Sequence, residues 1–467
     1  MPGVAGFWAT CGRRAACIGP LRFGFTTCGG ATVSTTEHRP RIVIVGGGFA
    51  GAYCAQALEK KLRPEAAEIV VINRENYFIF YPLLVEMGSG SVEPRHVVVS
   101  IRSFLRHARF VMGSVVGLDT QGKRVLWREP GGKQDNAEAY DHLVVALGSV
   151  TLLPPVEGLR EHGWQMKSTT DAVALRDRVI QMLEMADSSP DERRRRELLG
   201  FVVVGANFTG AEVAGELEAF LTAALKRYRR IRREEIGITL VDRADRILAA
   251  LEPDLSEYAR ETMARRGIDI RLRETVMRID ATSATLGNGE VIAAATVVWA
   301  AGIAPAPVIK RLGLPLDERG YIVCERDLRV RGFQEIWGIG DCAVNTDASG
   351  KPYPATAQHA VREGAWAAAN IARVLRGEAP LPCDLVSQGS LAALGCRTGV
   401  ASIMGVKLSG FWAWWLWRTV YLLKMPGLVR KLRLAIDWTL ELLFRREFVQ
   451  LGVHRADRGR GAEPEGA

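Results

Sequence analysis

Several patterns are missing from this 467-residue sequence, and each absence removes a class of protein. No window reaches the ~18 consecutive apolar residues of a membrane-spanning helix, because the nearest approach, Phe411–Leu423, is interrupted by Arg418. We therefore expect any membrane contact to lie on the surface of a bilayer. The eight cysteines are scattered, without a C-x-x-C pair or a His/Cys cluster. This pattern favours reduced, mostly buried thiols in the cytosol and predicts no metal site.

The charge of the chain is unbalanced, with 61 Lys and Arg against 52 Asp and Glu and a formal net charge of +9. Nucleic acid, an anionic membrane surface and an anionic cofactor can each explain such an excess. We interpret the run at 191–196 as a solvated loop, and we predict no nucleic-acid partner because no aromatic residues are interleaved with the arginines. The run at 226–233 is predicted to continue a long helix, with either a solvated basic face or a membrane-surface patch.

The two ends of the chain look different from its centre. Residues 1–39 contain no acid before Glu37 and are rich in Gly, Thr, Ala and Cys, which is typical of a transit peptide. A start codon at Val33 is the alternative, and we expect a disordered extension without function. Residues 453–467 are also predicted to be disordered.

The stretch Arg41–Gly51 organises the rest of the sequence. Four β-formers lead into Gly46, Gly48 and Gly51, which fit G-x-G-x-x-G, and a helix follows. The first glycine allows the turn, the second lets backbone approach a pyrophosphate, and the third lets helix pack on strand. The helix N-terminus would offer free N–H groups to the phosphates. This context predicts a dinucleotide site.

The strand after this helix, Glu68–Asn73, ends in an amide where a dinucleotide fold usually has an acid. Asn73 can hydrogen-bond a ribose hydroxyl, but without charge assistance. The departure favours FAD over NAD at this first site.

The same element recurs from Leu199 onward. Gly205 and Gly210 are in place, Asn207 replaces the middle glycine, and a matching strand ends at Asp242. An acid at this position suits a ribose 2′-hydroxyl rather than a 2′-phosphate, although Arg243 can weaken that preference. Two such turns predict a hydride relay from a nicotinamide to a flavin.

Other segments complete the predicted architecture. Buried strands run into Gly148 and Gly302, strands are expected at 327–330 and 336–341, and the aromatic segment 76–84 is predicted to be a packed loop. We predict an α/β fold with two Rossmann-like dinucleotide-binding domains. The FAD domain would comprise residues 40–160 and 296–395, and the NADH domain, inserted in it, residues 161–295.

The C-terminal region, residues 396–452, is predicted to associate with a membrane. Phe411–Lys424 is dense in tryptophan, and Leu428–Phe448 has apolar residues at helical spacing among basic ones. This describes a pair of amphipathic interfacial helices. The alternative is a helical pair buried against the body or in a dimer interface.

The assembled pattern resembles the two-dinucleotide-binding flavoproteins and, within them, type II NADH dehydrogenase, the single-subunit NADH:quinone oxidoreductase. The resemblance rests on the glycine turns, on 76–84, 208–212, 339–343 and 357–364, and on the tail. It implies a non-proton-pumping respiratory enzyme in which hydride passes from NADH to FAD N5 and two electrons then reduce a membrane quinone. It also implies a homodimer bound peripherally to the cytoplasmic face of the plasma membrane.

The resemblance assigns roles to residues of this chain. FAD would be held by Gly46, Gly48, Gly51 and Asp341, with Asn73, Gly148 and Gly302 near the cofactors. NADH would be bound by Gly205, Asn207, Gly210 and Asp242. Ala357 and Gln358 would lie by the isoalloxazine and the quinone, and Glu212 would lie near the nicotinamide and quinone. Glu212 and Gln358 are the candidate catalytic residues.

Structural interpretations of these residues stay open at this point. Glu212 can serve a helix dipole, Asp341 can cap a helix, and Gln358 can be an ordinary helix residue. His359 is more typical of packing, and Cys342 has no partner that would activate it. Arg362 replaces a glutamine of the family pattern, which leaves the electron acceptor open.

Three other functions are compatible with parts of this pattern: two belong to related enzymes and one to a protein without enzymatic activity. A sulfide:quinone reductase would need paired redox cysteines, and a ferredoxin reductase would not need the tryptophan-rich tail. A non-enzymatic NAD(H)-binding membrane protein is the alternative from another class.

Overall fold

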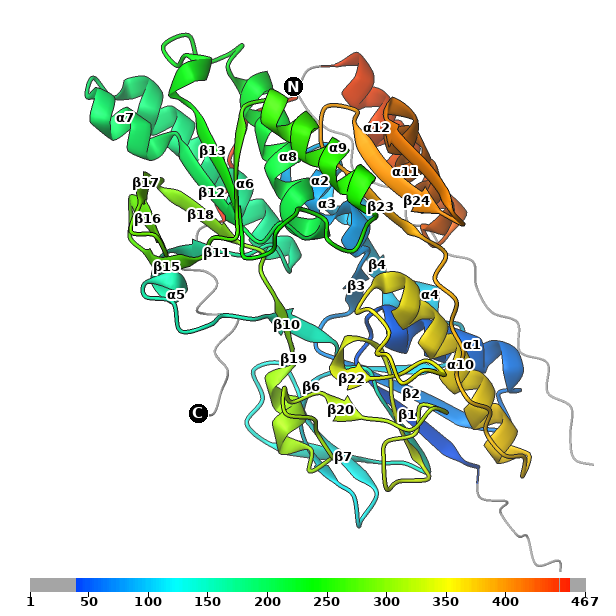
Figure 1. Cartoon of the computed structure of the whole chain (residues 1–467). Coiled ribbons are helices and arrows are strands. Elements are labelled where there is room, and N and C mark those ends of the chain that lie inside the picture. The colour runs from blue at the N-terminus through cyan, green and yellow to red at the C-terminus, as the bar shows by residue number, and fades with distance from the viewer. Residues whose placement is uncertain (1–38, 445, 454–467) are drawn as a thin grey trace, which may run out of the picture. The chain divides into compact units, whose positions relative to one another are not determined.

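Two parallel β-sheets frame the protein in a computed structural model that describes residues 39–444 and 446–453 (Figure 1). The first has the strand order β21-β9-β1-β2-β5 and the second the order β11-β18-β12-β13-β14. In each, the central strand, β1 (Arg41–Val45) or β12 (Gly200–Val204), leads into a glycine turn. The predicted α/β class with two Rossmann-like domains is confirmed. The segments predicted to be disordered, 1–39 and 453–467, fall almost wholly outside the described residues.

The first sheet draws its strands from distant parts of the chain. Its neighbours pair in parallel, and β1 is completely buried from Ile42 to Val45. The helices α1 and α10 pack side by side against it (Figure 1). The other elements of this layer are β2 (Glu68–Asn73), β5 (Arg109–Met112), β9 (His142–Val145), β21 (Ile336–Gly338), α1 (Phe49–Lys61) and α10 (Ala357–Leu375).

The second sheet is also entirely parallel. Because β18 (Thr296–Trp299) pairs with β12 in this sheet, the predicted return to the first domain at residue 296 comes one strand too early. The remaining elements are β11 (Gly163–Trp164), β13 (Gly237–Asp242), β14 (Ile268–Leu272), α6 (Thr169–Ser188), α8 (Phe208–Ala224) and α9 (Pro253–Arg265).

Two antiparallel strands, β10 (Ser149–Thr151) and β19 (Ile303–Pro305), carry the chain between the sheets. Smaller elements complete the two domains. They are the three-stranded sheets β6 (Ser114–Asp119), β7 (Arg124–Arg128), β8 (Asp135–Ala139) and β15 (Val276–Ile279), β16 (Ser283–Leu286), β17 (Val291–Ala293), with β4 (Val98–Ser100), β20 (Ile322–Val323), β22 (Ala343–Val344), α2 (Leu84–Gly88), α3 (Pro94–Val97), α4 (Ile101–Phe104) and α5 (Leu159–His162).

The C-terminal region begins with a three-stranded antiparallel sheet and ends in two helices. The elements are β23 (Ser390–Ala393), β24 (Gly399–Ile403), β25 (Val406–Gly410), α11 (Phe411–Lys424) and α12 (Leu428–Leu443). The predicted helix pair is confirmed, and α11 packs on the small sheet (Figure 1). Among the described residues, no helix combines the length and the apolarity needed to cross a membrane.

Two predictions for the arginine-rich segments are wrong. The segment expected to be a loop forms helix α7 (Glu192–Leu198), because Asp191 caps it by accepting a hydrogen bond from the Arg193 N–H at 2.9 Å. The segment 226–233, expected to extend a helix, is instead a turn after α8. Tyr228 and Ile231 are buried there, and this packing overrides helix propensity.

Two smaller predictions also need correction. The segment 76–84 is not a simple loop, because it contains strand β3 (Tyr77–Ile79) and a 3₁₀ turn, η1 (Tyr81–Leu83), although its aromatic residues are packed as expected. The segment 327–330 was expected to be a strand but forms a turn with isolated bridges, and Leu328 has a φ of 77°. A left-handed residue of this kind interrupts a strand.

Candidate functional site

The first glycine turn is shaped by contacts of the chain with itself at two positions and by open space at the third. A Cβ at Gly46 would collide with the Ala146 carbonyl, and a Cβ at Gly51 would collide with the Gly46 carbonyl. A Cβ at Gly48 would meet no protein atom within 4 Å. Gly48 also starts α1 without a side-chain cap, so the first N–H groups of the helix stay free. The turn therefore fits the pyrophosphate of a dinucleotide such as FAD.

Asn73, at the end of β2, holds this turn in place. Its Oδ1 accepts a hydrogen bond from the Gly47 N–H at 2.8 Å, and its Nδ2 donates to the Glu75 carbonyl at 2.7 Å. The amide thus uses both its donor and its acceptor on backbone. Its contact with a ribose remains a prediction.

The second glycine turn repeats this arrangement. Gly205 has a φ of 103°, and a Cβ at Gly210 would collide with the Gly205 carbonyl. Asp242, at the end of β13, accepts hydrogen bonds from the Ala206 N–H and, at 2.7 Å, from the Ala244 N–H. Asp242 therefore buttresses its turn as Asn73 does, and each carboxylate oxygen keeps a lone pair for another donor.

Asn207 fills the middle glycine position of the second turn without blocking it. Its Oδ1 accepts the Gly210 N–H at 3.0 Å and caps α8, and its Nδ2 donates to the Ala300 carbonyl at 2.9 Å. The side chain is folded against the helix and the adjacent strand end. Compared with a glycine at this position, Asn207 caps the helix, and the Gly210 N–H is therefore no longer free.

Asp341 follows β21 in a short 3₁₀ turn, η4 (Gly340–Cys342), close to the start of α10. Ser149 donates to its Oδ2 at 2.9 Å, and Lys167 in turn donates to the Ser149 Oγ at 3.0 Å. Burial lowers the pKa of Lys167, and the charge of Asp341 opposes this effect. Sequence reasoning missed Ser149, which opens β10, and Lys167, which precedes α6, because only the fold brings these two residues to Asp341.

Glu363 was also missed. It is 4% exposed on α10, accepts the Gly340 N–H at 2.6 Å and the Asn345 Nδ2 at 3.0 Å, and so fixes the turn that carries Asp341. Burial raises its pKa to about 7. A cavity of about 250 Å³ opens beside these residues and is lined by Asp341, Tyr353, His359 and Glu363 among others. The alternative that Asp341 caps the following segment is not seen, because Asp341 lies inside η4, whose N-cap is Ile339.

Gly148 and Gly302 lie at the two linking strands. Both have positive φ, 69° and 77°, and a Cβ at Gly148 would meet no protein atom within 4 Å. Ala357 and Gln358 open α10, one turn before Arg362. Gln358 pairs with the segment before β23, accepting the Gln388 N–H at 2.7 Å and donating to the Gly389 carbonyl at 3.3 Å. Arg362 donates to the Val386 carbonyl, so it anchors this same segment.

Glu212 reaches the C-terminal sheet from the other domain. Its Oε1 accepts the Ala393 N–H, the last residue of β23, at 3.2 Å. Burial raises the pKa of Glu212 to about 8, and the charge of Glu86 adds to this effect. Glu212 lies in the second turn of α8, so the helix-dipole explanation is disfavoured. The segment 388–393 therefore joins the two candidate catalytic residues, Gln358 at one end and Glu212 at the other.

An aromatic cluster lies beside Glu212. The Glu212 carboxylate raises the pKa of Tyr421 in addition to the effect of burial, which places the phenol within its electrostatic reach. The ring of Tyr421 is 4.8 Å from that of Trp417 and 6.2 Å from that of Phe80. A protonatable carboxyl among aromatic side chains suits a lipid-soluble ring with oxygen substituents.

The thiols do not form a redox pair among the described residues. Cys342 is buried and donates to the Ile339 and Val145 carbonyls at 3.4 and 3.5 Å, and burial raises its pKa to about 12. Burial also raises the pKa of Cys324. Neither thiol is poised to ionise, so the prediction that Cys342 is not catalytic agrees with its surroundings.

The C-terminal helices each have one buried and one exposed apolar face. Trp414 and Trp417 of α11 are 8% and 1% exposed, whereas Trp412 and Trp415 are 67% and 52% exposed. On α12, only Leu434 and Trp438 are buried. The other exposed apolar residues are Phe411, Leu423, Leu428, Val429, Leu432, Ile436, Leu440, Leu442, Leu443 and Phe444. One face of the helix pair is therefore buried against the body of the protein, as the alternative predicted. The other face is exposed and apolar, which agrees with the predicted interfacial helices.

A cluster of buried charges docks these helices on the body. The Glu86 carboxylate of α2 accepts from the Trp438 indole N–H at 2.8 Å and lies 3.4 Å from the Arg418 guanidinium. Arg418 also pairs with Glu441 at 2.6 Å, and Glu441 pairs with Arg446 at 2.5 Å. Burial raises the pKa of Glu86 to about 7, against the lowering effect of Arg418.

Comparison with known proteins places most of this chain in two described families of domains. The pyridine nucleotide-disulphide oxidoreductase family matches residues 40–364, and the NDH2 C-terminal domain matches residues 387–447. Demethylphylloquinone reductase NdbB of Synechocystis is 32% identical over 86% of this chain and 96% of its own length. Type II NADH:quinone oxidoreductase Ndh of Mycobacterium tuberculosis is 30% identical over 88% of this chain and 89% of its own. The structure of NDH2 from Plasmodium falciparum in complex with NADH has the same fold, with a TM-score of 0.82 at 19% identity, over 88% of this chain and 100% of that one.

Proposed function

Because the chain belongs to the pyridine nucleotide-disulphide oxidoreductases and, among them, to the type II NADH:quinone oxidoreductases, we propose that it oxidises NADH and reduces a quinone, with FAD as its cofactor. The observation that carries this function is the repeated site. In each of the two sheets the central strand leads into a glycine turn. The residue that ends the next strand, Asn73 or Asp242, accepts a hydrogen bond from this turn. A chain built this way holds two dinucleotides at once.

The first turn would hold FAD, which supplies a two-electron carrier between the nicotinamide and the quinone when it is bound. Gly48 and the free N–H groups of α1 would face its pyrophosphate, and Asp341 would accept from its ribityl hydroxyls. Lys167 and Ser149 orient the Asp341 carboxylate, and Glu363 fixes the backbone before it. Gly148, with open space at its Cβ position, and Ala357 would allow backbone to approach the cofactor.

The second turn would hold NADH. Asp242 keeps lone pairs for the ribose hydroxyls, and its charge disfavours a 2′-phosphate at the same place. Arg243 follows it and is exposed, so it can turn toward a phosphate. We therefore propose a preference for NADH over NADPH, and the size of that preference depends on Arg243.

The quinone would lie between Gln358, Glu212 and the aromatic cluster of Phe80, Trp417 and Tyr421. Two-electron reduction of a quinone to a quinol takes up two protons, so the site needs a proton donor. Glu212 meets this need because burial raises its pKa to about 8 and keeps the carboxyl protonated at neutral pH. The Ala393 N–H holds one of its oxygens, which fixes the direction of the other.

The exposed apolar faces of α11 and α12 support a peripheral position on a membrane, where a lipid-soluble quinone would reach the site directly. Lys424, Arg430, Lys431 and Arg433 lie among these residues and suit the anionic lipids of a cytoplasmic leaflet. We propose the cytoplasmic face of the plasma membrane and a homodimer on this basis and on that of the family. Size-exclusion chromatography with light scattering in detergent tests the dimer.

An anaerobic titration of the flavin spectrum tests the function. Addition of NADH to the purified, FAD-loaded protein is expected to bleach the oxidised flavin, and addition of a short-chain quinone to restore it. A flavin that NADH does not reduce would favour the non-enzymatic nucleotide-binding alternative. Bleaching that a quinone does not reverse, but a ferredoxin does, would favour a soluble reductase instead.

A further inference from the structure

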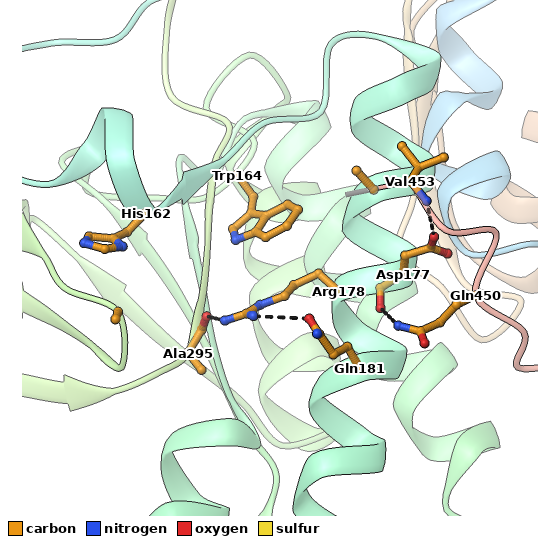
Figure 2. Close-up of a pocket in the computed structure, with 10 residues that line it drawn as sticks. His162, Trp164, Asp177, Arg178, Gln181, Ala295, Gln450 and Val453 are labelled. Carbon is orange, nitrogen blue, oxygen red and sulfur yellow. Dashed lines mark hydrogen bonds between the residues drawn. The ribbon is translucent and has the colours of Figure 1, made fainter. Parts of the chain in front are cut away.

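A cavity of about 280 Å³ in the second domain plays no part in the proposed reaction (Figure 2). It lies between β11, α6, the loop before β18 and the last described residues of the chain. His162, Trp164, Arg178 and Gln181 line one side, and Gln450 and Val453 line the other. Its volume is close to the lower end of the range for small-molecule sites.

The cavity lies at the opposite end of the sheet from the glycine turn. His162 directly precedes β11, and Ala295 directly precedes β18, so both mark the amino ends of neighbouring parallel strands. Dinucleotides bind at the carboxyl ends of such strands, where Gly205 follows β12. The cavity is therefore separate from the NADH site.

Arg178 brings a positive charge to this cavity. No ion pair joins it to any acid of the described residues, and burial together with the charge of Arg194 lowers its pKa. Its guanidinium donates to the Ala295 carbonyl at 2.7 Å and, at a long 3.4 Å, to the Gln181 amide. Its Nε is buried and has no acceptor. Of five N–H donors, at least two stay available to a ligand.

The other acids around the cavity are occupied. Asp177 lines it, but its carboxylate accepts the Val453 N–H at 2.9 Å (Figure 2). The same carboxylate also accepts the Leu451 N–H at 2.9 Å. Asp280, which lies within electrostatic reach of His162, is paired with Arg278 at 3.0 Å. The Asp177 carboxylate is thus engaged by the backbone of the C-terminal segment, whereas the Arg178 guanidinium keeps free N–H donors for an anion.

We propose that this cavity binds a small organic anion, a carboxylate or a phosphate ester, with the Arg178 guanidinium as its counter-charge. The fork of N–H donors would bind the anion's oxygens, and the Gln181 and Gln450 amides and the His162 ring would add hydrogen bonds. The Trp164 ring, 5.7 Å from the Arg178 guanidinium, would cover the organic part. A bound anion would contact both the NADH domain and the chain segment after α12.

Isothermal titration of the FAD-loaded protein with inorganic phosphate, citrate and benzoate, at constant ionic strength, tests this site. At least one of these probes is expected to bind once per chain. Arg178→Gln is expected to weaken that binding at least tenfold, whereas Arg193→Gln is the matched control, because the Arg193 side chain is 90% exposed and outside the cavity. Equal binding by wild type and Arg178→Gln, or no binding of any probe, would overturn the proposal.

A second variant, a competition with NADH and a shortened chain distinguish the remaining explanations. If Arg178→Gln does not fold, Arg178→Lys keeps the charge, loses the fork, and should bind more weakly than wild type. Saturating NADH should leave the affinity unchanged, and displacement by NADH would assign the binding to the coenzyme site instead. Binding that occurs only in a chain ending at Val453 would show that residues 454–467 fill the cavity, and it would also overturn the proposal.

Discussion

At the scale of single residues, the two glycine turns are held in place by different side chains. Asn73 and Asp242 each accept a hydrogen bond from a backbone N–H of the glycine turn that precedes them in the chain. The sequence predicts that both residues face a ribose, because that is their usual partner. The additional bond to the turn depends on how β2 and β13 align with their neighbours, and local sequence does not report this.

At Gly48, a side chain would not disturb the fold but would occupy the space proposed for the cofactor. Gly48→Ala, compared with wild type after FAD has been removed from both, is expected to keep its melting temperature within about 2 °C, because the added methyl meets no protein atom. The purified protein should nevertheless lose most of its FAD, since the methyl would occupy the place of the pyrophosphate. FAD content per chain, measured by absorbance, checks this.

Gly237→Ala is the matched control for this substitution. A Cβ at Gly237, at the start of β13, also meets no protein atom, but no cofactor is proposed there. It should retain full FAD content. Equal FAD content in Gly48→Ala and Gly237→Ala would contradict the assignment of the first turn to the pyrophosphate.

Glu212→Gln tests the proton donor. The amide keeps the acceptor for Ala393 but cannot give up a proton, so quinone turnover should fall at least tenfold while NADH still reduces the flavin at nearly the wild-type rate. Since the carboxyl with its pKa of about 8 is protonated below that value, wild-type quinone turnover should decline as pH rises through about 8. The variant should lack this decline, and a retained decline would assign the titration to another group.

At the scale of elements, the arginine-rich segments show where the sequence misleads. The arginines of 193–196 suggest a solvated loop by composition, yet Asp191 is a good cap and Leu198 is a buried anchor. Those two residues were the signal for a helix. At 226–233 the sequence predicts a continued helix, but Tyr228 donates to Glu184 of α6 at 2.7 Å and holds the chain in a turn. That contact is between segments far apart in the sequence, so no local pattern predicts it.

The strand and turn positions of both sheets, by contrast, followed from the sequence. Runs such as Ile42–Val45 and Phe201–Val204 are apolar throughout because they are buried on both faces. The helix pair α11 and α12 was predictable for a similar reason, from its apolar spacing. Which of its tryptophans face the body was not, because the apolar residues of α11 surround the helix.

The exposed tryptophans of α11 should contribute to membrane binding and the buried ones to folding. Trp412→Ala combined with Trp415→Ala is expected to reduce sedimentation with anionic liposomes several-fold and to leave the melting temperature nearly unchanged. Trp417→Ala is the reciprocal control, since loss of its buried ring should cost about 3–5 kcal/mol of stability. Unchanged liposome binding by the double variant would remove α11 from the membrane interface.

At the scale of the whole molecule, buried carboxyls near the domain junctions make stability depend on pH. Burial raises the pKa of Glu86 to about 7, so between pH ~4.5 and 7 the folded chain binds a proton that the unfolded chain releases. The free energy of unfolding should therefore fall as pH rises through this window. Glu212 and Glu363, with pKa values of about 8 and 7, act in the same direction.

Glu86→Gln should flatten this dependence. The fall in unfolding free energy between pH 5 and pH 8 is expected to be smaller by about 2–3 kcal/mol than in wild type. Melting temperatures across that range, with Glu192→Gln as a control on the exposed surface, measure the difference. Parallel curves for wild type and Glu86→Gln would mean that Arg418 keeps Glu86 ionised, contrary to the effect of burial.

The discontinuous first sheet sets an order of events during synthesis on the ribosome. Its edge strand β21 ends at Gly338, whereas the second sheet has received its final strand when β18 ends at Trp299, about 40 residues earlier. At roughly 5–20 residues per second, the second sheet is complete roughly 2–8 s before the first. A nascent chain stopped in that interval would hold a finished nicotinamide domain beside an unfinished flavin domain. If the second turn binds NADH as proposed, a fragment ending in that interval is expected to bind NADH without oxidising it, because its flavin domain lacks β21.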